Sequence, residues 1–154
     1  MLKMKLNQQA IGLILLTIIV TLLSGCFQKE AENPFATTLP AGLKETVVPN
    51  NHQTLGDILT DNKGMTLYTY SKDTEGKSNC QEQCAVNWPP LTVEGDPITP
   101  EDVGITLNVI VREDGRRQVT IDGKPVYYYI EDKKPGDANG QGLKNEWFAV
   151  ELPY

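Results

Sequence analysis

The chain has 154 residues and carries 14 basic against 20 acidic side chains, which gives a formal net charge of −6 at pH 7. Phosphate backbones and anionic lipid headgroups repel a chain with this acidic excess, so no nucleic-acid partner is expected. The length is enough for a single domain with a modest hydrophobic core.

The first 25 residues have the organisation of a secretory signal peptide. Lys3 and Lys5 precede an uncharged apolar run over residues 10–23. Residues 23–26, Leu-Ser-Gly-Cys, resemble the lipobox of bacterial lipoproteins, and this resemblance implies cleavage before Cys26 and acylation of Cys26. An uncleaved anchor is the alternative, but the apolar run is shorter than the ~20 residues of a membrane-spanning helix. We therefore expect Cys26 to attach the mature chain to a lipid bilayer outside the cytoplasm.

Residues 26–50 are expected to form a tether between the lipid and the folded domain. The segment shows little hydrophobic periodicity and contains Pro34, Pro40 and Pro49, which favour an extended chain. Its last part, residues 44–48, is able to add one strand to the domain. In the sorting rule of Gram-negative lipoproteins, an aspartate after the acylated cysteine retains the protein in the inner membrane. Phe27 occupies that position, which favours the outer membrane of the bacterial cell envelope.

Residues 51–154 are expected to form the folded domain, and they contain an internal duplication. Two repeat units, about 55–95 and 105–154, match when the sequence is shifted along itself by 59 residues. The identical pairs are Gly64 and Gly123, Tyr68 and Tyr127, Tyr70 and Tyr129, Asp73 and Asp132, and Trp88 and Trp147. Both tryptophans and four of the six tyrosines belong to these pairs, so we interpret the match as a duplication and not as chance.

Each repeat unit predicts β structure interrupted by tight turns. The Asp122-Gly123 pair lies between two alternating segments, which is a strong hairpin signal. We predict strands within residues 56–64, 65–70, 90–93, 106–112, 118–121, 125–130 and 147–150. Short helical turns are predicted at residues 81–86 and 99–102. The sequence therefore predicts an all-β fold in which two pseudo-symmetric β-repeat units share one core.

Two copies of one motif carry a family resemblance. Residues 68–73 and 127–132 each have the pattern Tyr-x-aromatic-x-x-Asp. Together with the Cys-x-x-x-Cys of residues 80–84, Asn-Trp-Pro-Pro-Leu at residues 87–91 and Trp147, these motifs resemble the secreted-repeat lipoproteins of bacteria. The resemblance extends over roughly residues 55–153. It implies the fold and the envelope location, and it does not supply a reaction.

The aromatic residues of the repeats are candidates for a ligand site. Alternate residues of a strand point to the same face, so Tyr68 and Tyr70 share a face, and Tyr128 points away from its two tyrosine neighbours. The candidate residues are Tyr68, Tyr70, Asp73, Trp88, Tyr127, Tyr129, Asp132 and Trp147. Such a cleft is able to stack a sugar, a flavin, a quinone or a peptide. The alternative, which we favour, is that these rings form the core and that their hydroxyl groups reach backbone groups or Asp73 and Asp132.

Cys80 and Cys84 are expected to form a short disulfide that holds the turn before Trp88, because the compartment outside the cytoplasm permits disulfides. The alternative is a reversible dithiol or a copper site, with His52 or Met65 as a further ligand. With a shift of 59 residues, the second repeat has Asn139 and Leu143 in place of the cysteines. Any thiol chemistry therefore belongs to one repeat.

Signatures of catalysis are scarce in this sequence. It has one histidine, no serine elbow and no glycine-rich phosphate loop. We expect a non-enzymatic lipoprotein without a cofactor, which acts as a binding or structural module of the cell envelope. Its expected partners are the bilayer, through Cys26, and an envelope component or small ligand. The alternative function is redox or copper handling by the pair Cys80 and Cys84.

Overall fold

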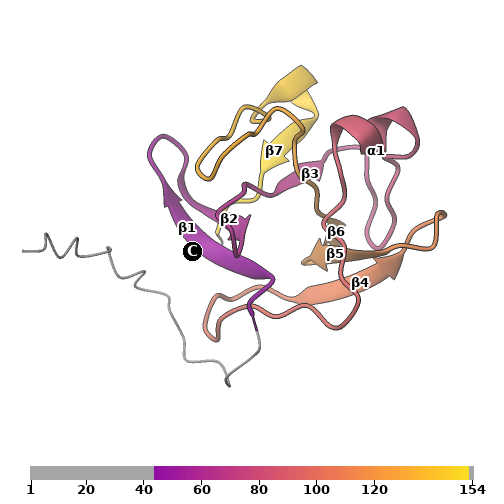
Figure 1. Cartoon of the computed structure of the whole chain (residues 1–154), viewed down its shortest axis with the longest axis horizontal. Coiled ribbons are helices and arrows are strands. Elements are labelled where there is room, and N and C mark those ends of the chain that lie inside the picture. Colours follow the sequence, from indigo (N-terminus) through magenta and orange to yellow (C-terminus); the bar gives the residue numbers. More distant parts are fainter. Residues whose placement is uncertain (1–43, 153–154) are drawn as a thin grey trace, which may run out of the picture. The chain divides into compact units, whose positions relative to one another are not determined.

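The computed structural model describes residues 44–152, and Figure 1 shows the arrangement of their strands. The predicted signal peptide, the predicted acylation site Cys26 and most of the predicted tether lie outside the described residues. The elements in chain order are β1 (Val47–His52), β2 (Gly56–Asp61), β3 (Tyr68–Tyr70), α1 (Gln83–Asn87), β4 (Leu107–Val111), β5 (Arg117–Ile121), β6 (Lys124–Pro125), the 3-10 helix η1 (Leu143–Asn145) and β7 (Trp147–Ala149).

The strands form three small antiparallel sheets. β1 pairs with β2, β4–β5–β6 is a three-stranded meander, and β3 pairs with β7 near the other end of the chain. The turn between β5 and β6 contains Asp122 and Gly123, both with positive φ (50° and 79°), as a type I′ hairpin turn requires. Strands predominate and helix is limited to short turns, so the predicted all-β fold is confirmed.

The two repeats exchange strands instead of folding separately. The tyrosine strand β3 of the first repeat pairs with β7, which contains the tryptophan of the second repeat. In return, Tyr128 and Ile130 of the second repeat donate backbone hydrogen bonds to the carbonyl groups of Pro89 and Asn87. The tyrosine segment of each repeat therefore pairs with the tryptophan segment of the other repeat.

A pseudo-twofold relationship follows from the backbone hydrogen bonds. At its centre, Tyr68 and Tyr127 each donate an amide hydrogen bond of 2.9 Å to the other's carbonyl group. Around this centre, three backbone hydrogen bonds join Leu59, Leu67 and Val150 to one another. Three equivalent bonds join Val119, Val126 and Leu91, in the same order, on the other side. The repeats are thus equivalent in structure as well as in sequence.

The core consists of two buried clusters, and both contain residues from each repeat. An aliphatic cluster is formed by Val47, Leu59, Leu67, Leu91, Val103, Val119, Ile121 and Val126. An aromatic cluster is formed by Ile58, Tyr68, Cys80, Trp88, Tyr127, Trp147 and Ala149. Because residues of both repeats contribute to each cluster, the prediction of a shared core is confirmed.

The structure differs from the predicted elements at several places. Residues 90–93, predicted as a strand, form only isolated bridges at Pro90 and Thr92. The strand expected from residues 44–48 is present as β1, but it begins at the buried Val47 and continues to His52, so the folded part includes residues that were predicted to end the tether. Residues 99–102 form a turn without a helix, and Asp102 has a φ of 69°, which is not helical. The strand predicted at residues 125–130 is short, because after β6 the backbone turns to meet the first repeat.

Candidate functional site

Four of the predicted site residues form a continuous ring stack. Tyr70 stacks on Trp147 with ring centroids 4.2 Å apart, and Trp147 lies parallel to Trp88 at 3.8 Å. Trp88 in turn stacks on Tyr129 at 4.3 Å. The stack therefore alternates between the repeats, with the two tryptophans at its centre and one tyrosine at each end.

The other two motif tyrosines lie across the edges of this stack. The rings of Tyr68 and Trp88 meet edge to face at 5.4 Å, and those of Tyr127 and Trp147 meet in the same way at 5.3 Å. Edge-to-face and offset-stacked pairs of this kind stabilise beyond the area that they bury. All six rings thus contact one another in one cluster.

Each motif aspartate accepts a hydrogen bond from the tyrosine of the other repeat. The hydroxyl group of Tyr68 donates to Asp132 Oδ2 and that of Tyr127 donates to Asp73 Oδ2, both at 2.6 Å. The other carboxylate oxygen of each aspartate accepts a backbone amide, from Asn79 and Asn139 respectively. The motif therefore couples the two repeats through buried hydrogen bonds.

Burial controls the acidity of these groups. It raises the pKa of the Tyr68 and Tyr127 hydroxyl groups far above the ordinary value, and the carboxylate that accepts each bond raises the pKa further. Burial also raises the pKa of Asp73, although Tyr127 and the Asn79 amide act in the opposite direction. These tyrosines stay neutral donors throughout the physiological pH range.

The structure brings all eight predicted ligand-binding residues together, and these residues stack on one another or form hydrogen bonds with one another. The faces of Trp88 and Trp147 are covered by other rings, and both aspartates are occupied by tyrosine hydroxyl groups. Only the two end rings, Tyr70 and Tyr129, are partly exposed. The arrangement is that of a core, as the favoured interpretation of the sequence expected, with ligand access limited to its ends.

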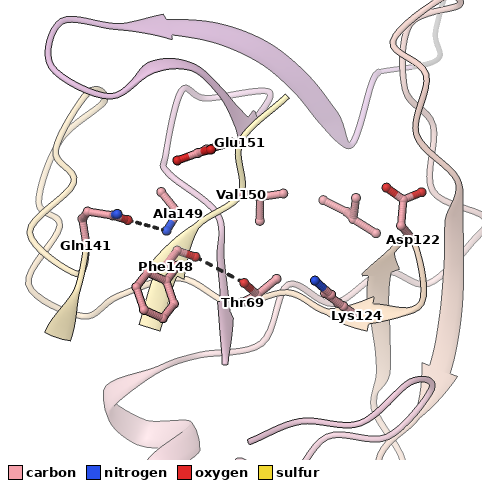
Figure 2. Close-up of a pocket in the computed structure, with 9 residues that line it drawn as sticks. Thr69, Asp122, Lys124, Gln141, Phe148, Ala149, Val150 and Glu151 are labelled. Atoms are coloured by element: carbon pink, nitrogen blue, oxygen red, sulfur yellow. Dashed lines mark hydrogen bonds between the residues drawn. The ribbon is translucent and has the colours of Figure 1, made fainter. Parts of the chain in front are cut away.

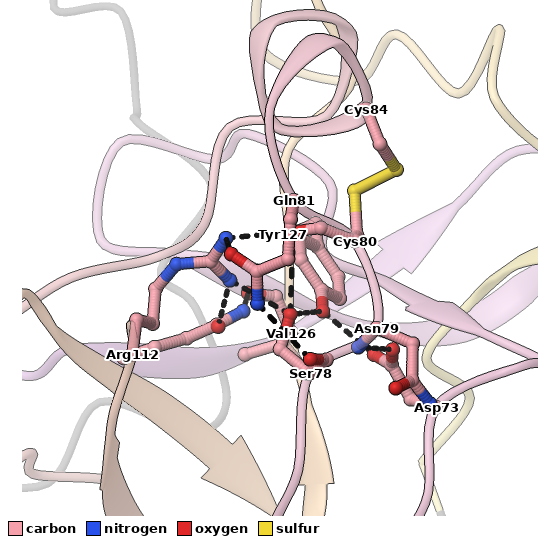
Figure 3. The surroundings of a disulfide bond; sticks show 10 residues. Asp73, Ser78, Asn79, Cys80, Gln81, Cys84, Arg112, Val126 and Tyr127 are labelled. Carbon is pink, nitrogen blue, oxygen red and sulfur yellow. Dashed lines mark hydrogen bonds between the residues drawn. A yellow bond between two sulfur atoms is a disulfide. The ribbon is translucent and has the colours of Figure 1, made fainter. Parts of the chain in front are cut away.

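The predicted disulfide between Cys80 and Cys84 is present, with a Cα–Cα separation of 5.1 Å. A buried guanidinium group lies beside its loop (Figure 3), which the sequence did not reveal. Arg112, at the end of β4, donates to the carbonyl oxygen of Cys80 at 2.6 Å, to Gln118 Oε1 at 2.6 Å and to Ser78 Oγ at 2.8 Å. The disulfide and this arginine together fix the segment that leads to Trp88.

The structure corrects the residue that corresponds to Cys80. The amides of Asn79 and Asn139 bind the two motif aspartates in the same way, which sets a local shift of 60 residues. By this shift Gly140, and not Asn139, occupies the place of Cys80. An extra residue after Asp132 explains why the fixed shift of 59 failed here.

The alternative metal ligands lie in other bonding arrangements. His52 Nδ1 accepts the amide of Leu55, and Nε2 donates to the carbonyl oxygen of Gly136. Met65 lies in the turn after β2, where its amide binds Asp61. A copper site at Cys80 and Cys84 would therefore require reduction of the disulfide. Within residues 44–152, no three His, Cys, Asp or Glu side chains form a group that could hold a metal.

The two ends of the ring stack differ, although the scaffold beneath them is equivalent. At the Tyr70 end, Lys72 lies over the ring at 5.9 Å and forms an ion pair of 2.5 Å with Glu146. The residues that correspond to this pair at the other end are Glu131 and Asn87. There, a cavity of about 260 Å³ is present instead.

The cavity at the Tyr129 end is lined by both apolar and polar groups. Trp88, Tyr129, Trp147, Ile130 and Leu143 provide the apolar wall, and Asn87, Glu131 and Lys144 provide the polar groups. Ile130 is 43% exposed. We call this cavity the stack-end site. It is a candidate ligand site because it combines aromatic, aliphatic and hydrogen-bonding groups in one concave surface.

A second cavity of about 400 Å³ contains none of the predicted site residues (Figure 2). It lies beside β7, β3 and the turn between β5 and β6, and Thr69, Ile121, Lys124, Phe148 and Val150 are among its lining residues. We call it the Thr69 cavity. A comparison of Thr69 with Tyr128 in the printed sequence could have indicated it, because these residues correspond in the two repeats.

Comparisons with known proteins bear on the family of this chain. A family model described as a secreted repeat of unknown function matches residues 52–92 and 108–151, which together are more than half of the chain. Comparison with the curated proteins and with the solved structures found no match. The matched segments coincide with the two repeats, and a secreted repeat has an extracellular or envelope location. In residues 44–152 no helix is long and apolar enough to cross a membrane. By its two matched repeats, this chain belongs to the family of secreted repeats of unknown function.

Proposed function

We propose that this chain is a lipid-anchored, non-enzymatic binding module of the cell envelope, which takes its ligand at the stack-end site. The observation that carries the proposal is the difference between the two ends of the ring stack. One end carries the ion pair of Lys72 and Glu146 beside its tyrosine ring, and the corresponding place at the other end is a cavity. A duplicated scaffold needs no such difference for folding, so the open end is the place to expect binding.

The chemistry of the stack-end site suits a carbohydrate bearing acetamido groups. Tyr129 has one stacked neighbour among the described residues, Trp88, and it is partly exposed, which suits contact with the apolar face of a sugar ring. Ile130 and Leu143 can contact an acetamido methyl group, while Glu131 and Asn87 can bind its amide and the hydroxyl groups of the sugar.

The test is a titration of the protein with oligosaccharides of N-acetylglucosamine, followed by tryptophan fluorescence. Both tryptophans line the stack-end site, so occupancy should change their emission. Tyr129→Ala should weaken binding at least tenfold. Tyr70→Ala is the matched control, because the two tyrosines stack equally well on their tryptophans but Tyr70 does not line the stack-end site.

The outcomes separate binding from folding. Equal losses of thermal stability in the two variants, with loss of binding only in Tyr129→Ala, support the proposal. Equal binding by both variants, or no saturable change with the wild-type protein, contradicts it.

The anchor is tested independently of the ligand. The signal peptide and the lipobox resemblance support acylation of Cys26. Protein extracted from its own membrane should begin at Cys26 and carry the added mass of the acyl groups, and Cys26→Ser should lose that mass and keep residues 1–25. Wild-type protein extracted without the acyl mass would contradict the lipid anchor.

A further inference from the structure

The Thr69 cavity lies where the second half of the pseudo-symmetric scaffold lacks a large side chain. Thr69 follows the central Tyr68, and Tyr128 follows the central Tyr127, so the two residues correspond. Each also faces an equivalent partner on the neighbouring strand, since Thr69 pairs with Phe148 and the amide of Tyr128 binds the carbonyl group of Pro89. The backbone therefore places both side chains in equivalent surroundings.

In the first of these surroundings, the ring of Tyr128 fills the space. It packs against the aliphatic cluster, which includes Leu91, and its hydroxyl group donates to Asp61 Oδ2 at 3.0 Å. Burial, together with the negative charge of Asp61, raises the pKa of this hydroxyl group well above its ordinary value. The position thus accommodates a neutral phenol ring with an acceptor at its hydroxyl end.

Around Thr69, residues equivalent to those that surround Tyr128 line the cavity, but Thr69 has no ring to fill it. Val150 takes the place of Leu91, because the two residues form equivalent backbone hydrogen bonds: Val150 with Leu59 and Leu67, and Leu91 with Val119 and Val126. Ile121 and Lys124 form the backbone pair that closes the turn between β5 and β6. Asp61 and Met65 form the equivalent pair after β2, so Ile121 takes the place of Asp61 and Lys124 that of Met65. Figure 2 shows Val150 and Thr69 facing Lys124 and Asp122 across the space.

Polar groups also line the Thr69 cavity. Asp122 and Lys124 come from the turn that corresponds to the one holding Asp61, and Glu151 adds a second carboxylate to the lining. A carboxylate accepts a phenol's O–H, and an ammonium group donates to its oxygen. Phe148, 37% exposed, adds an aromatic surface at the rim.

We propose that the Thr69 cavity binds a small phenolic compound, whose ring occupies the place that the ring of Tyr128 fills in the other half. The ring contacts Ile121 and Val150, and its hydroxyl group binds Asp122 or Lys124. A volume of about 400 Å³ is within the range of small-ligand pockets and exceeds what one ring needs. This proposal is independent of the stack-end site.

The experiment is a titration of the wild-type protein with p-cresol, the analogue of a tyrosine side chain, followed by amide NMR. We expect saturable shifts centred on Thr69, Ile121, Phe148 and Val150, with a dissociation constant on the order of 1 mM for so small a ligand. Toluene, which lacks the hydroxyl group, should bind at least fivefold more weakly. Shifts that do not saturate, or that centre on the stack-end site, overturn the proposal.

Substitution of Thr69 provides the second arm. Thr69→Tyr should fill the cavity from within the chain, so it should abolish p-cresol binding and raise the melting temperature. Thr69→Ser is the matched control and should leave binding within twofold of the wild type. Unchanged p-cresol binding by Thr69→Tyr overturns the proposal. If Thr69→Tyr does not fold, the map of shifts on the wild-type protein decides alone.

Two further arms identify the source of the phenol and separate the two sites. N-acetyltyrosinamide distinguishes a tyrosine side chain of a peptide from a free phenol: tighter binding than p-cresol assigns the site to a peptide, and weaker binding assigns it to a free compound. Tyr129→Ala should leave p-cresol binding unchanged. Failure of the glycan titration therefore has no bearing on this cavity.

Discussion

Replacement of Gly140 by alanine tests whether the aromatic cluster is as tightly packed as the structure requires. An added Cβ at Gly140 would lie 2.8 Å from Trp88 Cη2, 2.8 Å from Tyr68 Cε1 and 2.9 Å from Trp88 Cζ3. All three are ring atoms, and the rings are held by the stack and by the bond from Tyr68 to Asp132. The added methyl group can be accommodated only if these rings move.

The expected cost of Gly140→Ala follows from this crowding. Overpacking of a well-packed core by one carbon atom costs about 1–3 kcal/mol. For a domain of this size, each kcal/mol lowers the melting temperature by roughly 4–8 °C, so we expect a fall of about 4–24 °C. Denaturant unfolding followed by tryptophan fluorescence should report the same loss, because Trp88 is one of the displaced rings.

Gly95→Ala is the control for Gly140→Ala. An added Cβ at Gly95 would meet no atom within 4 Å, and the residue is exposed. This substitution should be neutral or should stabilise by up to about 1 kcal/mol, through the unfolded chain. If Gly140→Ala is as stable as Gly95→Ala, the rings are not packed as described and the reasoning is refuted.

Three other predictions concern buried groups of the same core. Burial raises the pKa of Tyr68, Tyr127 and Tyr128. Their contribution to stability is therefore complete below about pH 10 and is lost as the pH rises above that value. An alkaline titration of phenolate absorbance should show that these tyrosines ionise only when the protein unfolds. Burial raises the pKa of Asp73, so as the pH falls the folded state binds a proton at this carboxylate before the unfolded state does. The stability due to this group therefore increases as the pH falls towards about 4. Asp73→Asn should remove that increase from the pH dependence of the denaturation midpoint. Reduction of the disulfide should lower the free energy of unfolding by about 2 kcal/mol, as expected for so short a loop, and an unchanged midpoint in reductant would show that the bond constrains nothing.

Much of the fold was predictable because the signals are local or repeated. Asp122-Gly123 specifies a type I′ turn by backbone conformation alone, and the structure has that turn. The alternation of Tyr127, Tyr128 and Tyr129 correctly separates the two clusters, since Tyr128 packs on the aliphatic cluster and its neighbours belong to the aromatic one. The helical turn predicted at residues 81–86 is present as α1.

The features that were missed depend on contacts between distant residues. Nothing local to β3 indicates that it pairs with β7 of the other repeat, because the sequence of two equivalent repeats is compatible with separate or exchanged strands. The burial of Arg112 depends on Gln118 and on the disulfide loop, which lie on different elements. Both sites proposed here arise from small differences between equivalent positions, such as Thr69 and Tyr128, whose consequences appear only once the shared scaffold is known.

The central claim is that the tyrosine and tryptophan motif joins the two repeats into one cooperative core, which leaves binding to the places where the repeats differ. Amide hydrogen exchange of Tyr68 and Tyr127 tests it most directly, because each amide binds the carbonyl group of the other across the pseudo-twofold axis. Both amides should exchange only by global unfolding, with equal free energies that match the value from denaturant unfolding. Exchange of one of them at a free energy several kcal/mol below the other would show that the repeats open separately and would contradict the account.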